Sequence, residues 1–239
     1  MLAVALGACS TQPPVSSLDA REILERAIEA QDGHRPPAGT VRSEYRVALY
    51  TTEEKDAPPL TGQLRVIHGE DEKERLELET IDGRSLLQIF DGQVGAEWEN
   101  GIASRRDLLP EVRRRAVYRN LLREMLREDR GPAARVAEIV GSPTDREVVV
   151  ERLIAGDLWR VFIEEDSSLL KRILCSFEGE GGRVVQEDYL SDYRRVGERL
   201  LPGRQVTVRN GRKIKEATLE DRRENIEVPP DFFELPDGG

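Results

Sequence analysis

Cysteine, histidine and aromatic residues are scarce in this chain, and no long hydrophobic run is present. It has two cysteines and two histidines among 239 residues, without the spacing of a zinc site, which excludes zinc fingers and disulfide scaffolds. No apolar run reaches the roughly 18 residues that a membrane-spanning helix needs. Basic residues are also in deficit, 36 against 46 acidic ones, and this net charge of −10 disfavours nucleic-acid binding.

Catalytic motifs are missing as well. The sequence contains no G-x-S-x-G elbow and no G-x-x-x-x-G-K phosphate loop. His34 lies in a proline-rich loop and His68 at the end of an expected strand, so we expect both at the surface. We therefore expect no enzyme, no metal and no cofactor. Charged residues make up 34% of the chain and hydrophobic ones 38%, which is typical of one globular domain with a highly charged surface.

The N-terminus carries the most specific motif. Small and aliphatic residues at 2–8 lead to Cys9, and Leu6-Gly7-Ala8-Cys9 resembles the bacterial lipoprotein box. The motif implies cleavage before Cys9, whose sulfur would carry the lipid; the alternative is a chance cysteine. No basic residue precedes the apolar run, which indicates a start codon further upstream. We thus expect a partial signal peptide at 1–8, a flexible tether at 9–17 and one domain at 18–239.

The second cysteine would then be unpaired. If Cys9 is acylated, Cys175 has no partner for a disulfide. It lies in an expected strand with no histidine nearby in sequence, so we interpret it as a small buried hydrophobic residue.

Two segments have helical spacing. Apolar residues of 18–31 recur three and four positions apart, and Ser17 or Asp19 is a suitable N-cap. The second segment, 104–130, contains four arginines at intervals of four, which would form one cationic stripe: Arg115, Arg119, Arg123 and Arg127. The stripe could contact anionic head groups or an acidic partner, or be a solvated face paired with neighbouring glutamates.

Most of the rest alternates between polar and apolar residues. Asp82-Gly83, Asp91-Gly92 and Asn100-Gly101 are strong hairpin turns, because type I′ turns need positive φ. Strands are expected over 41–51, 60–68 and 75–81, two more up to 100, and then over 134–140, 147–154, 158–164, 169–177, 183–194, 205–209 and 213–222. The sequence predicts a mainly β (α+β) fold, in which a strongly curved antiparallel sheet forms an incomplete barrel. About 11–12 strands in sequential order would be covered by two or more helices.

A half-barrel with apolar inner positions offers concave hydrophobic surface, the usual form of a lipid or acyl-chain pocket. The alternative is that the same residues only pack on the helices. The candidate cavity residues are Tyr45, Val47, Leu64, Val66, Leu76, Leu78, Leu87, Ile89, Trp98, Trp159, Val161 and Ile163.

The order of these elements resembles the LolA/LolB-like outer-membrane lipoprotein-sorting superfamily, over most of the chain after residue 17. The resemblance rests on loose patterns: the amphipathic helix around Ile23-Leu-Glu-Arg-Ala-Ile28, a meander from Asp91-Gly92 to Trp98, and a closing segment with Asp192-Tyr-Arg-Arg-Val-Gly197, Leu201-Pro202, Asn225-Ile226 and Phe232-Phe233.

This resemblance implies an incomplete barrel of roughly eleven strands with a helical lid and an apolar cavity. It implies a role in the bacterial cell envelope, in holding lipids or lipoprotein acyl chains. The family's soluble carrier has no lipid anchor, so Cys9 points to an anchored, periplasm-facing member at the outer membrane. We expect a monomer that binds lipid, with an envelope protein as a further partner. The alternative is a non-catalytic scaffold or sensor whose hollow is filled by its own helices.

Overall fold

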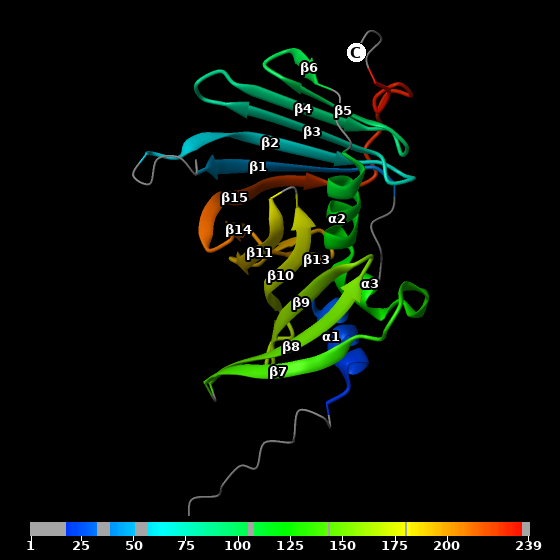
Figure 1. The fold of residues 1–239 in the computed structure, drawn as a ribbon, viewed down its shortest axis with the longest axis vertical. Helices are drawn as coiled ribbons and strands as arrows, with labels where there is room; N and C mark the ends of the chain where they lie inside the picture. Colours follow the sequence, from blue (N-terminus) through cyan, green and yellow to red (C-terminus); the bar gives the residue numbers. More distant parts are fainter. Residues whose placement is uncertain are drawn as a thin grey trace, which may run out of the picture.

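The computed structural model describes residues 18–32, 39–50, 57–104, 108–142, 144–179 and 181–235. Within these residues one antiparallel sheet of thirteen strands dominates the molecule (Figure 1). Its strands are β1 (Val41–Leu49), β2 (Leu60–His68), β3 (Glu74–Thr80), β4 (Ser85–Phe90), β5 (Gly95–Glu99), β6 (Ile102–Ser104), β7 (Arg135–Ser142), β8 (Asp145–Ile154), β9 (Asp157–Glu164), β10 (Leu170–Gly179), β11 (Gly182–Ser191), β14 (Arg204–Arg209) and β15 (Arg212–Arg223). A separate hairpin consists of β12 (Arg194–Val196) and β13 (Arg199–Leu201).

The strand order explains why the barrel stays open. It runs β6-β5-β4-β3-β2-β1-β15-β14-β11-β10-β9-β8-β7, so the first and last strands pair, with Val47 opposite Ala217. The edges, β6 and β7, are consecutive strands of the sheet, and the chain between them forms helices instead. The predicted incomplete barrel is confirmed. A purely sequential order is wrong at two places, since β1 pairs with β15 and β6 does not pair with β7. Alternation within a strand does not specify its neighbours.

Three helices accompany the sheet: α1 (Ala20–Asp32), α2 (Leu109–Arg119) and α3 (Leu121–Leu126), the last followed by a 3-10 turn over Glu128–Arg130. Asp19 is the N-cap of α1, since its Oδ1 accepts a hydrogen bond from the backbone N–H of Arg21 at 2.9 Å. The expected two or more helices are confirmed, and the second segment with helical spacing, 104–130, is divided. Asn120, at φ −115° and ψ 22°, interrupts it between α2 and α3.

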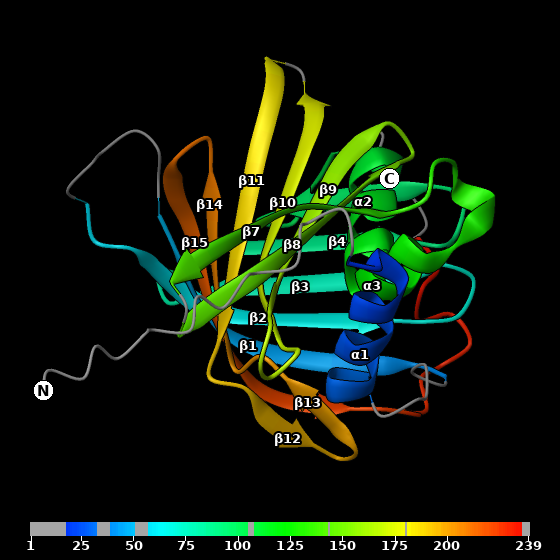
Figure 2. The same ribbon diagram turned by 90° about the horizontal axis from the view of Figure 1, so that it is seen from below.

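The helices lie on the concave side of the sheet, with α1 beside α3 (Figure 2). Leu24 and Ala27 of α1 and Met125 of α3 pack there against side chains of β8, β9 and β10. This cluster is the main hydrophobic core of the described residues.

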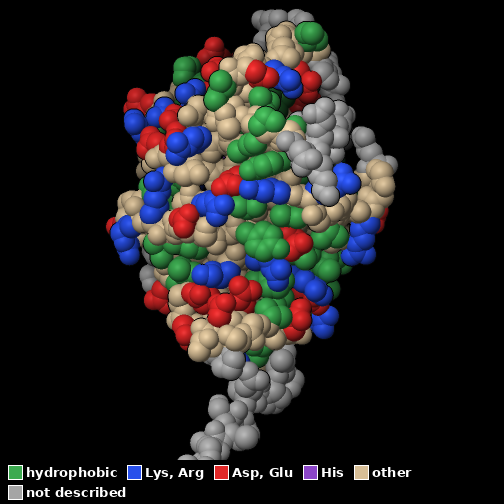
Figure 3. All heavy atoms as spheres, turned by 90° about the vertical axis from the view of Figure 1, so that its left-hand side faces the viewer, with side chains coloured by type: hydrophobic (Ala, Val, Ile, Leu, Met, Phe, Trp, Pro, Cys, Tyr) green, Lys and Arg blue, Asp and Glu red, His purple; other side chains and the backbone are tan. Residues whose placement is uncertain are grey.

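The opposite face of the sheet carries much of the charge. Arg65 of β2 donates hydrogen bonds to Glu44 of β1 at 3.2 Å and to Glu77 of β3 at 2.9 Å. Acidic and basic side chains alternate with hydrophobic ones over the side of the molecule away from α2 and α3 (Figure 3). Cross-strand ion pairs therefore account for part of the high charge content.

Candidate ligand-binding site

We call the concave, inner face of the sheet, on which the helices lie (Figure 2), the hollow. The hollow has two halves, which differ in how far helices cover them. In the filled half, formed by β8–β10 with α1 and α3, inner-facing Val161 and Trp159 are 0% and 3% exposed, and Leu24 of α1 is 0% exposed. No apolar surface of this half is left uncovered at these positions.

The open half is the inner face of β1–β4. Register places Leu64 of β2 opposite Tyr45 of β1 and Leu78 of β3, so the three side chains share the inner face. In the next row Val66 lies opposite Leu76. All of these residues, and Leu86 of β4 opposite Leu78, keep part of their surface exposed. The open half thus presents apolar side chains that no helix fully covers.

The structure divides the twelve predicted cavity residues into three groups. Six lie on the inner face of the open half: Tyr45, Val47, Leu64, Val66, Leu76 and Leu78. Three lie on the inner face of the filled half and pack on the helices: Trp159, Val161 and Ile163. The remaining three, Leu87, Ile89 and Trp98, lie on the outer face of β4 and β5.

The outer-face placement follows from the register of β4. Leu76 pairs with Gln88, so Leu86, Gln88 and Phe90 face the hollow. The segment Ser85–Phe90 has apolar residues on both faces, and its alternation cannot tell which face is inner. Leu86 and Phe90 were missed for this reason.

α2 closes one end of the open half. Its Val112, with Leu108 just before the helix, packs on Phe90 of β4, and all three are buried. Arg115 extends from α2 to Glu74 of β3, with its Nη2 2.5 Å from Glu74 Oε1.

Glu74 is the most buried charge in this end, at 2% exposure of its side chain. Burial alone would raise its pKa, but the neighbouring His68 and Arg115 outweigh this and lower the pKa to about 2. His68 Nδ1 lies 3.3 Å from Glu74 Oε2, and its side chain is only 16% exposed. The expectation that His68 is a surface residue is therefore wrong, because its strand end is covered by α2. His34 lies outside the described residues.

The four arginines do not form one stripe. Arg115 faces inward, whereas Arg119 is exposed at the end of α2. After the break at Asn120, Arg123 is partly buried in α3. Arg127 follows α3 and forms ion pairs with Asp129 at 2.7 Å and Glu124 at 3.2 Å. Because the helix is interrupted at Asn120, arginines four residues apart do not lie on one continuous helix face.

A polar cluster lies on the inner face where β11, β14 and β15 join the open half. Asp188 of β11 is 2% exposed and accepts hydrogen bonds from Thr207 Oγ1 at 2.5 Å and Gln205 Nε2 at 2.8 Å. The same Gln205 amide donates to the hydroxyl of Tyr118 in α2 at 3.1 Å. Lys215 of β15 faces the hollow beside Thr207, its register partner.

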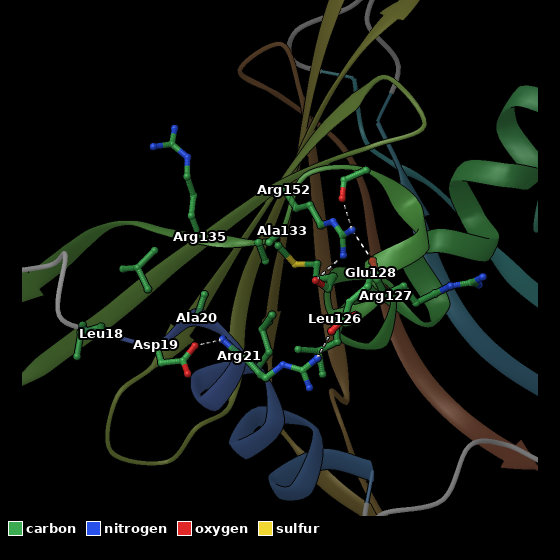
Figure 4. Close-up of a pocket in the computed structure, with 15 residues that line it drawn as sticks. Leu18, Asp19, Ala20, Arg21, Leu126, Arg127, Glu128, Ala133, Arg135 and Arg152 are labelled. Atoms are coloured by element: carbon green, nitrogen blue, oxygen red, sulfur yellow. Dashed lines mark hydrogen bonds and ion pairs between the residues drawn. The ribbon is translucent and has the colours of Figure 1, made fainter.

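A separate cavity of about 500 Å³ lies between the start of α1, the end of α3 and the edge strands β7 and β8 (Figure 4). Arg152 of β8, 3% exposed, borders it. Its guanidinium donates hydrogen bonds to main-chain oxygens of Met125 at 2.8 Å, Glu124 at 3.1 Å and Gly131 at 3.2 Å, and also to that of Arg127. Arg152 thus binds the C-terminal end of α3, where the helix dipole favours a cation.

Reactive groups are few in the described part of the chain. Cys175 is a buried free thiol on the inner face of β10, as predicted, and burial raises its pKa to about 12. Within the described ranges no group of three or more histidine, cysteine or acidic side chains could hold a metal ion. Cys9 lies outside the described residues.

The helices of the described residues, α1, α2 and α3, are short. None of them is both long enough and apolar enough to cross a bilayer.

Solved structures of similar fold cover almost the whole chain. A LolA superfamily protein from Nitrosomonas europaea aligns with a TM-score of 0.58 and 12% identity, over 92% of this chain and 99% of its own. A DUF1329 family protein from Desulfovibrio piger aligns with a TM-score of 0.55 and 13% identity, over 93% and 98%. A domain of a putative outer membrane lipoprotein-sorting protein from Vibrio parahaemolyticus aligns with 0.53 and 10%, over 90% and 95%.

Sequence comparison alone does not find these proteins: no family model and no curated protein matches the chain. The resemblance predicted from the residues is confirmed as a likeness of structure. The chain has the fold of the LolA superfamily.

Proposed function

We propose that this chain is a bacterial envelope protein that binds lipid, or the acyl chains of lipoproteins, in the open half of its hollow. The observation that carries the proposal is the row of partly exposed apolar side chains there, Leu64, Leu76, Leu78 and Leu86 among them. A concave apolar surface with a few polar groups is the usual form of a lipid site. The shared fold with a lipoprotein-sorting domain supports the same function.

The anchor belongs to this proposal. Lipidation of Cys9 would fix the domain to a membrane leaflet through the tether at 9–17, and we place it at the outer membrane, facing the periplasm. In that position an acceptor or carrier could receive acyl chains without diffusing away. The proposal is for a monomeric binding protein without catalytic activity.

Native mass spectrometry tests the function. The full chain with Cys9→Ser, which cannot itself be lipidated, is expressed with a periplasmic export signal and purified without detergent. We expect an additional mass that denaturation releases as phospholipid, fatty acid or acylated peptide. A protein that stays ligand-free, and remains so after lipid is added, contradicts the function.

A matched pair of variants locates the ligand. Leu78→Glu places a charge on the inner face of β3, whereas Glu79→Gln changes the exposed neighbouring residue. We expect Leu78→Glu to abolish the co-purifying mass and Glu79→Gln to retain it.

The second candidate is a scaffold whose hollow serves as a core. The filled half favours it, because α1 and α3 pack there against buried side chains of β8, β9 and β10. A ligand-free mass in both variants and in the parent would support this candidate, and the search would turn to protein partners.

A further inference from the structure

Lys215 is a cation on the inner face of the sheet that has no bonding partner among the described residues. It lies on the inner face of β15, between Thr207 of β14 and Leu49 of β1, and is partly buried. Within the described part of the chain its ammonium group makes neither a hydrogen bond nor an ion pair within 4.0 Å. Burial lowers the pKa of Lys215; nearby Asp188 opposes this shift, and the charges of Arg115 and Arg209 add to it.

The nearest carboxylate, Asp188, is already engaged. Besides Thr207 and Gln205, the Gln186 amide donates to it at 3.1 Å. Three donors satisfy its oxygens without a contact from Lys215. A buried ammonium group next to a saturated carboxylate costs free energy, unless another anion occupies the space in front of it.

A second donor lies beside the same carboxylate. The hydroxyl oxygen of Tyr118 accepts from Gln205, but among the described residues its own proton has no acceptor. Gln205 bonds to both Tyr118 and Asp188, and Thr207, the register partner of Lys215, bonds to the same Asp188, so this hydroxyl and Lys215 both border the Asp188 cluster. Together they offer N–H and O–H donors to an oxyanion.

Apolar surface begins directly next to Lys215. Leu49 pairs with Leu60 of β2, and both are partly exposed. Further along the same inner face, Leu64 and Leu78 continue the apolar surface of the open half.

We propose that Lys215, assisted by Tyr118, binds the oxyanion head group of an amphiphile whose hydrocarbon chain lies on the open half. This assignment rests on the proposed lipid-binding function and adds the ligand class to it: single anionic head groups, carboxylate or phosphate, rather than neutral lipids. Lys213, two residues away, provides a contrast, since it lies at the rim, bonded to Glu216 and over the ring of Tyr50.

Calorimetric titrations of the full chain with Cys9→Ser distinguish an anionic head group from a neutral one. The three ligands are dodecanoate, dodecyl phosphate and the neutral ester methyl dodecanoate. In that background, Lys215→Met is compared with Lys213→Met and with the parent. We expect Lys215→Met to weaken binding of one or both anions by about 10- to 100-fold, the value of a charged hydrogen bond, and to leave methyl dodecanoate unchanged. Which anion loses more affinity shows whether the head group is a carboxylate or a phosphate. Lys213→Met should bind all three like the parent.

Equal binding of acids and ester, unaffected by Lys215→Met, would overturn the head-group site while leaving the lipid-binding function intact. Failure of every protein to bind any of the three would remove the function itself. If Lys215→Met does not fold, as judged by its thermal midpoint, Lys215→Gln takes its place.

A direct measurement does not depend on a variant's stability. The chain has five lysines, few enough for 13C-dimethylation and NMR titration of each amine. We expect the signal of Lys215 to titrate at a lower pH than the others and its pKa to rise when dodecanoate binds. An unchanged Lys215 signal in a protein saturated with dodecanoate would overturn the proposal.

Discussion

In the filled half, α1 and α3 cover the inner face of the sheet, whereas in the open half apolar side chains on the same kind of surface stay partly exposed. Val161 and Leu78 are both aliphatic, inner-facing and central in their strands, yet the first is 0% exposed and the second is not buried. Position in a strand therefore does not decide whether a residue is core or lining. The placement of the helices decides it.

The position of the barrel opening accounts for this difference. The chain leaves the sheet after β6, forms α2 and α3, and returns at β7, so α3 lies nearer the strands that follow it. α2 covers the end of the open half around Phe90 and Glu74, and its last turn packs through Val117 and Tyr118 against the main core. One half of the hollow contributes to the hydrophobic core, whereas the other half keeps apolar side chains partly exposed.

Arg152→Met should have the largest effect, because it detaches the helix end that fills one half. Its guanidinium donates to four main-chain oxygens at the end of α3, and methionine replaces none of these bonds. We expect a loss of about 4 kcal/mol in the free energy of unfolding. Urea titrations measure it, with Arg46→Met as the control, since Arg46 is 67% exposed and should change stability by about 0.5 kcal/mol or less. Similar losses in both variants would contradict the role of Arg152.

A pair of leucine truncations tests the two halves directly. Leu24→Ala removes a fully buried side chain from the filled half and should cost about 3 kcal/mol. Leu78→Ala, in the open half, should cost about 1 kcal/mol, because its side chain already meets solvent. Lipid binding should show the opposite order, with Leu78→Ala the weaker binder. Equal stability losses would mean that the open half is a core.

Glu74 gives the open half a distinctive response to acid. Its pKa in the folded protein, about 2, lies below the usual value of 4.5, so its contribution is complete above pH 5 and is lost as the pH falls towards 2. A shift of this size corresponds to about 3 kcal/mol. Glu74→Gln should therefore lower stability at pH 7 and largely remove this acid-induced loss.

Hydrogen exchange can locate the acid effect. Lowering the pH from 5 to 3 should reduce the protection factors of the amides in β3, next to Glu74, before it reduces those of β9 in the filled half, once the slower intrinsic exchange at low pH is accounted for. Simultaneous loss of protection in both strands would show that the halves unfold as one unit. Glu79→Gln, exposed on β3, is the matched control and should keep the parent's pH profile.

Turns and strands could be predicted from the sequence more fully than the way in which these elements are arranged. Turn dipeptides and alternation placed the hairpins. Asn100 and Gly101 both adopt the positive φ of a type I′ turn, whereas at Asp82-Gly83 and Asp91-Gly92 only the glycine does, so the expected turn type is wrong there. The pairing of β1 with β15 carries no local signal, and neither does the break at Asn120, so the number of helices and the strand neighbours could not be derived.

The candidate site could be predicted only in part, because the sequence shows alternation within a strand but not which face of the strand is inner. Leu64 and Leu78 could be assigned to one face by alternation, but Leu87 could not, since β4 is apolar on both faces. Lys215 was missed altogether. A lone lysine in a strand is normally solvated, and only the register shows that it lies opposite Leu49 on the inner face.

The smallest expected effect concerns two turns, one in the filled half and one next to the open half. Ala155, between β8 and β9, has φ +53° and is followed by Gly156 at +91°, the conformation that Asn100 and Gly101 adopt between β5 and β6. Alanine is strained at positive φ, whereas asparagine is tolerated there. Ala155→Asn should therefore raise stability by about 0.5–1 kcal/mol, measured by urea titration. Asn100→Ala should lower it by at least as much, because Asn100 Oδ1 also accepts from the Ser85 N–H at 2.9 Å. A destabilised Ala155→Asn would mean that the turn of the filled half is held by contacts other than its backbone conformation.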